Sequence, residues 1–344
     1  MVSLCATVFN EADSIGPWLS SLKRQSRRPD EIVICDAGST DGTLDRLRDW
    51  AEEAPEHRLI VVEGATIPVG RNVAIEAAAG PLIAVTDAGT ILDQDWLEKL
   101  LAPLENDPGL AVSAGFYRPD GRNRFEKILA AVITPRREDM SDDGFPPSSR
   151  SVAFRKEWWQ RVGGYPEWLR ACEDLVFDHQ LIDAGARFAF ADDAIVSWYP
   201  RPTLKDYFGQ YSLYARGDGH AHIYLGRHLI RYCAYAAGVV LAVMSRRSRL
   251  ARLVLAVGFS AHMRRYVRRV RRDRPVDGFW AGLGAYALVP VIVITGDVAK
   301  MVSYPRGLLE RHRAGGPAGL AEAQFESHRA EKRGASPKPE IPGG

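Results

Sequence analysis

The first 90 residues carry three uncharged, largely apolar runs, at residues 2–9, 32–35 and 82–86. Runs without polar alternation are typical of strands that are covered on both faces. Between the first two runs, the mixed pattern of residues 14–24 predicts a helix. Because strands joined by helical crossovers lie parallel in one sheet, the pattern predicts an α/β fold around a parallel sheet.

Each of these runs ends in polar or acidic residues. Asn10 and Glu11 follow the first run, Asp36 follows the second, and Asp87 with Gly89 follows the third. The carboxyl ends of parallel strands meet at one edge of a sheet, where open α/β sheets bind nucleotides. We therefore expect these residues to line one crevice that attracts a cation or sugar hydroxyls.

The loop over residues 36–43 reads Asp-Ala-Gly-Ser-Thr-Asp-Gly-Thr and is the most informative segment of the chain. Gly38 permits a tight turn and the close approach of a ligand. Asp36, at the strand tip, can accept hydrogen bonds from a base or a ribose. An ordinary turn with a capped helix explains the same residues, so the loop by itself leaves both interpretations open.

A second acidic cluster, Glu173 and Asp174, stands at the head of a predicted amphipathic helix. Acidic residues at a helix start often do no more than cap it and complement its dipole. Upstream, Ser149 and Arg150 lead into a predicted strand at residues 152–154. Arg150 can reach a phosphate with bidentate geometry or simply be solvated.

Together these residues resemble the family 2 glycosyltransferases, which have the GT-A fold. Residues 7–11 and 36–43 look like the two nucleotide-binding strand ends, and residues 70–72 (Gly-Arg-Asn) are similar to the helix start of that family. Residues 87–89 (Asp-Ala-Gly) stand where its DxD motif is expected, and residues 173–174 match its acidic pair. The resemblance covers about residues 2–220 and implies a nucleotide-sugar-binding sheet with helices on both faces.

The resemblance also implies roles for single residues. Asp174 is the expected catalytic base, because one carboxylate must deprotonate the acceptor hydroxyl as it attacks the anomeric carbon, and Glu173 orients it or binds the acceptor. The expected donor-binding residues are Asn10, Glu11, Asp36, Gly38, Arg71, Asp87 and Gly89. Those expected on the acceptor or phosphate side are Ser149, Arg150, Trp198 and Arg216.

Two departures from the family pattern concern the metal. Gly89 occupies the position of the last Asp of the DxD motif, and Trp198 stands where a family His is common. A divalent cation, Mg²⁺ or Mn²⁺, would then rely on Asp87, water and the donor diphosphate. The alternative is that cationic side chains stabilise the leaving diphosphate without a metal.

The C-terminal third differs in charge and hydropathy. The net charge of the chain is +2, but residues 246–274 hold eleven arginines and one acid, a local charge of +10 that leaves −8 elsewhere. Uncharged segments lie before this stretch at residues 232–244, within it at residues 253–261 and after it at residues 279–296, and only the last approaches the roughly 20 residues that cross a bilayer. This pattern predicts contact with anionic membrane lipid on the cytoplasmic face rather than with nucleic acid.

We therefore expect a GT-A catalytic domain at residues 1–225, a membrane-associating helical region at residues 226–312 with its strongest span at 279–296, and a disordered tail at residues 313–344. Four scattered cysteines and no signal before the first strand predict a cytoplasmic catalytic domain at the cell membrane.

The expected function is transfer of a sugar from a nucleotide sugar to an acceptor hydroxyl, with inversion, on a lipid-linked or cell-envelope acceptor. A nucleotidyltransferase and a non-catalytic nucleotide-sugar-binding or scaffold protein are the alternatives. The former lacks support because no Gly-rich loop with Lys follows the first strand.

Overall fold

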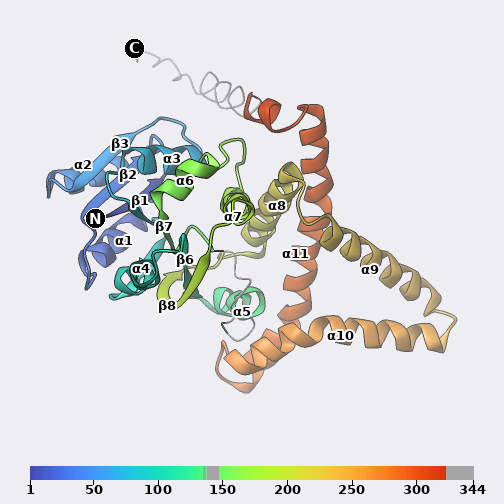
Figure 1. The fold of residues 1–344 in the computed structure, drawn as a ribbon. Helices are drawn as coiled ribbons and strands as arrows, with labels where there is room; N and C mark the ends of the chain where they lie inside the picture. Colours follow the sequence, from blue (N-terminus) through green and yellow to red (C-terminus); the bar gives the residue numbers. More distant parts are fainter. Residues whose placement is uncertain (135–136, 138–146, 323–344) are drawn as a thin grey trace, which may run out of the picture.

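The computed structural model describes residues 1–134, 137 and 147–322. Within them an eight-stranded sheet occupies the N-terminal two thirds, and long helices form the remainder (Figure 1). The strands are β1 (Val2–Val8), β2 (Glu31–Asp36), β3 (His57–Val61), β4 (Leu82–Val85), β5 (Thr90–Leu92), β6 (Val112–Pro119), β7 (Val152–Arg155) and β8 (Phe188–Trp198). The helices are α1 (Ile15–Lys23), α2 (Thr43–Glu52), α3 (Ile67–Ala77), α4 (Trp96–Asn106), α5 (Arg124–Ile133), α6 (Lys156–Val162), α7 (Glu173–Asp183), α8 (Leu204–Ala221), α9 (Leu225–Met244), α10 (Arg249–Asp273) and α11 (Phe279–Arg313).

The sheet is parallel in its first half and mixed in its second. Its strand order is β3-β2-β1-β4-β7-β6-β8-β5. The strands β2, β1 and β4 are parallel, as the apolar runs predict, and β3, which no run predicted, is parallel to β2; β7 pairs antiparallel with both β4 and β6. The crevice at the ends of β1, β2 and β4 therefore has β7 and its preceding loop as a neighbour.

Helices cover both faces of the sheet, which confirms the expected layering. Alternate residues of β1 point to opposite sides. Leu4 packs in a core with Trp18 of α1 and Trp96 of α4, while Cys5 packs in another with Ile75 of α3. The free cysteines Cys5 and Cys35 are both buried.

A third core joins the C-terminal helices α10 and α11 to α5 and α8. It contains Ile128 and Val132 of α5, Tyr207 of α8, Met263 of α10, and Ile292 of α11. The long helix α11 runs beside α8 and α5, and α9 and α10 form a hairpin that projects away from the sheet (Figure 1). The region expected to be a tail, residues 313–344, begins with ordered structure, because α11 ends at Arg313 and residues 317–322 are helical; residues 323–344 lie outside the described residues.

Candidate active site

The carboxylate of Asp36 is enclosed by its own loop. It accepts hydrogen bonds from the backbone N–H groups of Gly38 (2.9 Å) and Ser39 (2.8 Å) and from the Ser39 hydroxyl (2.6 Å), and the residue is fully buried. Gly38 has φ +89°, a conformation that favours glycine. Asp36 therefore holds the loop in shape and presents no exposed oxygen to a base or ribose, unlike the direct contact that the sequence suggested.

Asn10 ties the first strand end to the second. Its backbone N–H donates to the Ser39 hydroxyl (2.9 Å), and its side-chain oxygen accepts from the Thr40 N–H (2.9 Å). The neighbouring Glu11 carboxylate accepts a hydrogen bond from Ser14. It also lies beside Gly89, because a Cβ at that glycine would be 4.0 Å from both Glu11 oxygens. The structure thus brings the strand-end residues together, as predicted.

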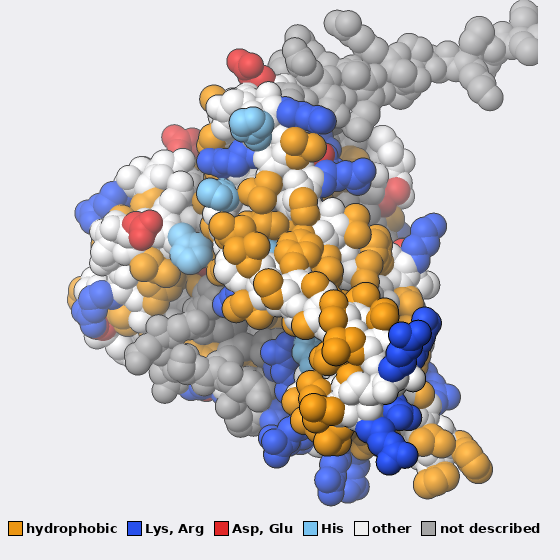
Figure 2. Space-filling view, turned by 90° about the vertical axis from the view of Figure 1, so that its right-hand side faces the viewer, with side chains coloured by type: hydrophobic (Ala, Val, Ile, Leu, Met, Phe, Trp, Pro, Cys, Tyr) orange, Lys and Arg blue, Asp and Glu red, His pale blue; other side chains and the backbone are white. Residues whose placement is uncertain are grey.

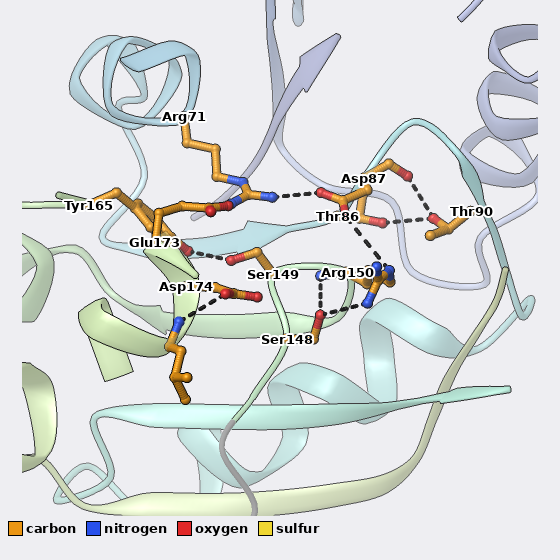
Figure 3. Close-up of polar contacts among 11 residues, drawn as sticks. Arg71, Thr86, Asp87, Thr90, Ser148, Ser149, Arg150, Tyr165, Glu173 and Asp174 are labelled. Carbon is orange, nitrogen blue, oxygen red and sulfur yellow. Dashed lines mark hydrogen bonds and ion pairs between the residues drawn. The ribbon is translucent and has the colours of Figure 1, made fainter. Parts of the chain in front are cut away.

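Arg71 is buried between the two acidic clusters (Figure 3). One terminal nitrogen donates to Glu173 Oε1 at 2.6 Å, and the other donates to Asp87 Oδ1 at 2.8 Å. The guanidinium also lies 5.4 Å from the ring centre of Tyr165, and the Arg71 side chain is only 5% exposed. This single cation therefore links the end of β4 to the head of α7.

Gly70 allows Arg71 to reach that position. A Cβ at Gly70 would overlap the Thr7 hydroxyl, so only glycine lets α3 lie this close to β1.

The second oxygen of Asp87 faces Arg150. Arg150 Nε is 3.9 Å from Asp87 Oδ2, and its guanidinium lies over the ring of Trp198 at 5.3 Å. Both Asp87 and Arg150 keep part of their side chains exposed, at 34% and 27%. The mouth of the crevice therefore presents an arginine whose guanidinium has an incomplete ion pair and an aromatic support.

The two acids at the head of α7 differ in their surroundings. Glu173 is buried and paired with Arg71, whereas Asp174 is partly exposed and accepts the N–H of Leu175 at 2.9 Å. Burial and the nearby charge of Asp174 raise the pKa of Glu173, and the contact with Arg71 opposes that rise. Asp174 faces the same space as Ser149 and Arg150 (Figure 3).

One acid of this helix was not anticipated from the sequence. Asp178 is buried one turn after Asp174, and its Oδ2 has no hydrogen-bond partner within the described part of the chain. Burial raises its pKa well above the usual range, and the charge of Asp174 adds to the effect. Its only sequence signal was an acid at a four-residue spacing from Asp174 in a predicted amphipathic helix.

The remaining predicted residues fall into two places. Ser149 is buried and hydrogen-bonds the Tyr165 hydroxyl at 3.1 Å, next to Glu173, and Trp198 supports Arg150. Arg216 points elsewhere: it makes a bidentate pair with Glu310 of α11 at 2.5 and 2.7 Å and lines a cavity of about 430 Å³ between α8 and α11. The structure gives Arg216 no contact with Ser149, Arg150 or Trp198 among the described residues.

The residues around Asp87 do not form a protein cage for a divalent cation. Hard cations prefer several oxygen ligands, yet Asp87 is engaged by Arg71 and faces Arg150, and Gly89 supplies no side chain. In the described ranges, no group of three or more His, Cys, Asp or Glu residues is placed to hold a metal ion. Any cation here would depend on the donor itself.

Residues 3–163 match the family model for glycosyl transferase family 2. Two curated relatives are glycosyltransferase AglE of Haloferax volcanii, 25% identical over 207 residues (58% of this chain, 67% of that protein), and succinoglycan biosynthesis protein ExoA of Rhizobium meliloti, 29% identical over 229 residues (61% and 66%). A third is the O-antigen chain rhamnosyltransferase WbaN of Salmonella anatum, 23% identical over 209 residues (56% and 64%). These matches span about two thirds of the relatives' own length.

The fold is shared with a solved structure, the mannosyltransferase PcManGT from Pyrobaculum calidifontis in complex with GDP-Man and Mn²⁺. The likeness has a TM-score of 0.52 at 19% identity and covers 90% of this chain and 86% of that one. Residues 3–163, just under half of the chain, thus match glycosyl transferase family 2, the curated relatives include glycosyltransferases, and the solved structure shows that the chain has a GT-A-like fold.

Proposed function

We propose that this protein transfers a sugar from a nucleotide donor to an acceptor hydroxyl with inversion, and that Asp174 is the catalytic base. The two α7 acids have different partners, and this difference is the main support for the proposal. Glu173 is held by Arg71, whereas among the described residues Asp174 has only a backbone hydrogen bond and stays partly exposed. A carboxylate that must accept a proton has to be reachable and free of a cationic partner.

In the proposed reaction, the acceptor O–H gives its proton to the Asp174 carboxylate. The acceptor oxygen attacks the anomeric carbon as the bond from that carbon to the diphosphate oxygen breaks, and the electron pair leaves with the diphosphate. Inversion follows from a single displacement without a covalent enzyme intermediate.

Arg150 is the proposed partner of the leaving diphosphate. Its side chain is 27% exposed, its Nε lies 3.9 Å from Asp87 Oδ2, and its guanidinium donates to the Ser148 hydroxyl at 3.3 Å and rests on Trp198, so its position is fixed at the mouth of the crevice. Cationic groups that meet developing charge are a major source of transition-state stabilisation. Asp87, Glu11 and the loop held by Asp36 would then shape the nucleotide side of the crevice.

The proposed acceptor is a lipid-linked or cell-envelope glycan at a membrane surface. Two relatives bear names that concern envelope polysaccharides, succinoglycan and O-antigen. In addition, α11 is long and apolar enough to be a candidate membrane helix. We propose that the catalytic part works on the cytoplasmic face, beside anionic lipid.

Asp174→Asn tests the base. The amide keeps the shape of the side chain but cannot accept a proton, so we expect turnover to fall about 100 to 10,000-fold with donor affinity nearly unchanged. A panel of nucleotide sugars is first screened by thermal shift, and nucleoside diphosphate release is then followed with polyprenyl-diphosphate-linked sugars as acceptors.

Glu173→Gln is the matched control at the neighbouring position. It leaves Asp174 free and should cost far less turnover while lowering the melting temperature. If Asp174→Asn keeps more than about a third of the wild-type turnover, the assignment of the base is wrong. Donor binding without any release by the wild-type protein would instead favour a nucleotide-sugar-binding role.

A further inference from the structure

The C-terminal helices expose an apolar surface that the catalytic site does not use. We call it the apolar platform, and it consists of the α9–α10 hairpin and the outer face of α11. Its exposed side chains include Ile230, Val240, Leu253, Val257, Trp280 and Ile294. Figure 2, which looks at the hairpin side, shows hydrophobic side chains in a broad band with Lys and Arg gathered around its lower part.

The inner face of α11 is not available to lipid. Its buried residues recur along the whole helix, from Ala285 through Ile292 and Gly296 to Gly307, and they pack on α5 and α8. The approach to α8 is close, since a Cβ at Gly307 would overlap the Arg216 carbonyl and a Cβ at Gly219 would lie 2.5 Å from the Tyr304 carbonyl oxygen. A helix that crosses a bilayer at this position would have to take these two helices of the catalytic part with it.

The hairpin is also unsuited to crossing. The uncharged segments of α9 and α10 have 13 and 9 residues, which span about 20 and 14 Å against a hydrocarbon core of about 30 Å. Arg231 precedes the first segment, Arg246 and Arg247 lie in the turn between the two helices, and Arg249 and Arg252 lie in the first turn of α10. Insertion with the tip first would place four arginines in hydrocarbon, which is costly.

Polar contacts hold the hairpin against α11 on its inner side. Asp297 of α11 accepts from Arg231 Nε at 2.8 Å and from the Tyr235 hydroxyl at 3.1 Å, and the Tyr232 hydroxyl donates to the Met301 carbonyl at 2.6 Å. Polar contacts on the inner side therefore join the α9–α10 hairpin to α11, while the apolar platform faces outward. An interfacial membrane element has this arrangement.

We infer that the apolar platform lies in the plane of one anionic leaflet and that no described helix crosses the bilayer. In this position the apolar side chains enter the boundary of the acyl chains, and the arginines between the two apolar segments of the hairpin and in the second half of α10 reach the lipid phosphates. The inference rests on the proposed membrane association and specifies its geometry. Alternation of arginine with apolar segments fits a lipid surface better than nucleic acid.

Depth measurements on the full chain test this geometry. Cys233 is exposed on α9, seven residues before Val240, and provides a native labelling site. In a Cys233→Ser background, Leu283→Cys, Ile294→Cys and Val302→Cys place the same fluorophore along the exposed face of α11. Vesicles of phosphatidylcholine with phosphatidylglycerol carry quenchers either near the headgroups or at the bilayer centre.

We expect all four labels to be quenched more strongly by the shallow quencher. Strong quenching of Ile294→Cys from the bilayer centre, with shallow positions on both sides of it, would show that α11 crosses and would overturn the inference. If the protein binds no vesicle, the proposed membrane association is wrong. The catalytic proposal is tested separately, by nucleoside diphosphate release in the presence of soluble acceptors.

A charge variant tests the lipid phosphate contacts. Arg264→Gln, Arg268→Gln and Arg271→Gln combined should weaken binding to anionic vesicles at least about tenfold, because each surface arginine adds to the attraction. The matched control, Arg24→Gln, Arg28→Gln and Arg48→Gln, removes the same charge from the sheet side of the molecule and should change affinity less than about threefold. Equal losses in both variants would contradict a localised platform.

Discussion

Asp178 shows that the local sequence does not reveal every unusual residue of the site. The resemblance to the family singled out Glu173 and Asp174, which are adjacent, but it gave no reason to notice an acid four residues later. The structure gives the reason: Asp178 is buried, and one of its oxygens has no partner among the described residues. The partnership of Arg71 with Glu173 was equally hidden, because 102 residues separate them in the chain.

Asp178→Asn should change how stability depends on pH. Burial, followed by the Asp174 charge, raises the Asp178 pKa in the native state, so the folded protein keeps a proton that the unfolded chain releases above pH ~4. Wild-type stability therefore falls as pH rises from about 4 toward the raised pKa, by up to about 1.4 kcal/mol per pH unit. The asparagine variant lacks this loss.

Urea unfolding of both proteins between pH 5 and pH 8 measures this difference. The free energy of unfolding of Asp178→Asn relative to wild type should increase with pH over that range. A difference that stays constant would mean that the Asp178 pKa is the same in the folded and unfolded states.

A substitution at Gly89 tests whether the protein itself supplies ligands to a divalent cation. Only the Glu11 oxygens, at 4.0 Å, lie near a Cβ built there, so an aspartate fits and adds a carboxylate beside Glu11 and Asp87. Oxygen ligands on the protein tighten a hard cation. We expect shallow metal dependence in the wild type and a lower metal concentration for half-maximal activity in Gly89→Asp.

The measurement is a Mn²⁺ and Mg²⁺ titration after chelation, with metal binding followed by calorimetry in the absence of donor. Gly89→Asn serves as the control, because it adds similar volume without the charge. Stoichiometric, tight metal binding by the wild-type protein without nucleotide would show that other residues complete a site.

At the scale of helices and strands, the elements that could be predicted are those with a pattern in their own residues. The apolar runs gave β1, β2 and β4 to within a residue or two, and the acidic head of α7 was placed correctly. The insertion of β7 between β4 and β6 was not predicted, because pairing between distant strands leaves no periodicity in either one. That insertion is what brings Ser149 and Arg150 beside Asp87.

The close approach of α3 to β1 makes Gly70→Ala an informative variant. The added Cβ would overlap the Thr7 hydroxyl, and overpacking of this kind typically costs about 1–3 kcal/mol. Gly16→Ala is the control, because a Cβ there meets nothing within 4 Å and alanine favours a helix. Denaturant unfolding should show a lower free energy of unfolding only for Gly70→Ala. Adding Thr7→Ala to this variant should restore part of the lost stability. Equal effects at both glycines would contradict the close contact.

At the scale of the whole molecule, α8 belongs to both the catalytic part and the C-terminal helices. A Cβ at Gly217 of α8 would lie 2.6 Å from the Ala171 carbonyl, just before Glu173, and the Cys172 thiol contacts the Tyr214 carbonyl at 3.3 Å. On its other side α8 packs along α11. The boundary expected at residue 225 therefore marks a change in amino-acid composition. Through α8, the residues before this boundary pack against α11 after it.

Gly307→Val tests whether this joint structure unfolds as a unit. The valine would collide with the Arg216 carbonyl and push α11 from α8, at a cost of about 1–3 kcal/mol. If the two regions are cooperative, a fluorophore on Cys233 of α9 and thermal protection by donor at the crevice should report the same lowered transition. Gly258→Val, on an open face of α10, should leave both readouts near wild type. A lowered α9 transition with unchanged donor-site unfolding would show instead that α9, α10 and α11 fold as a separate domain.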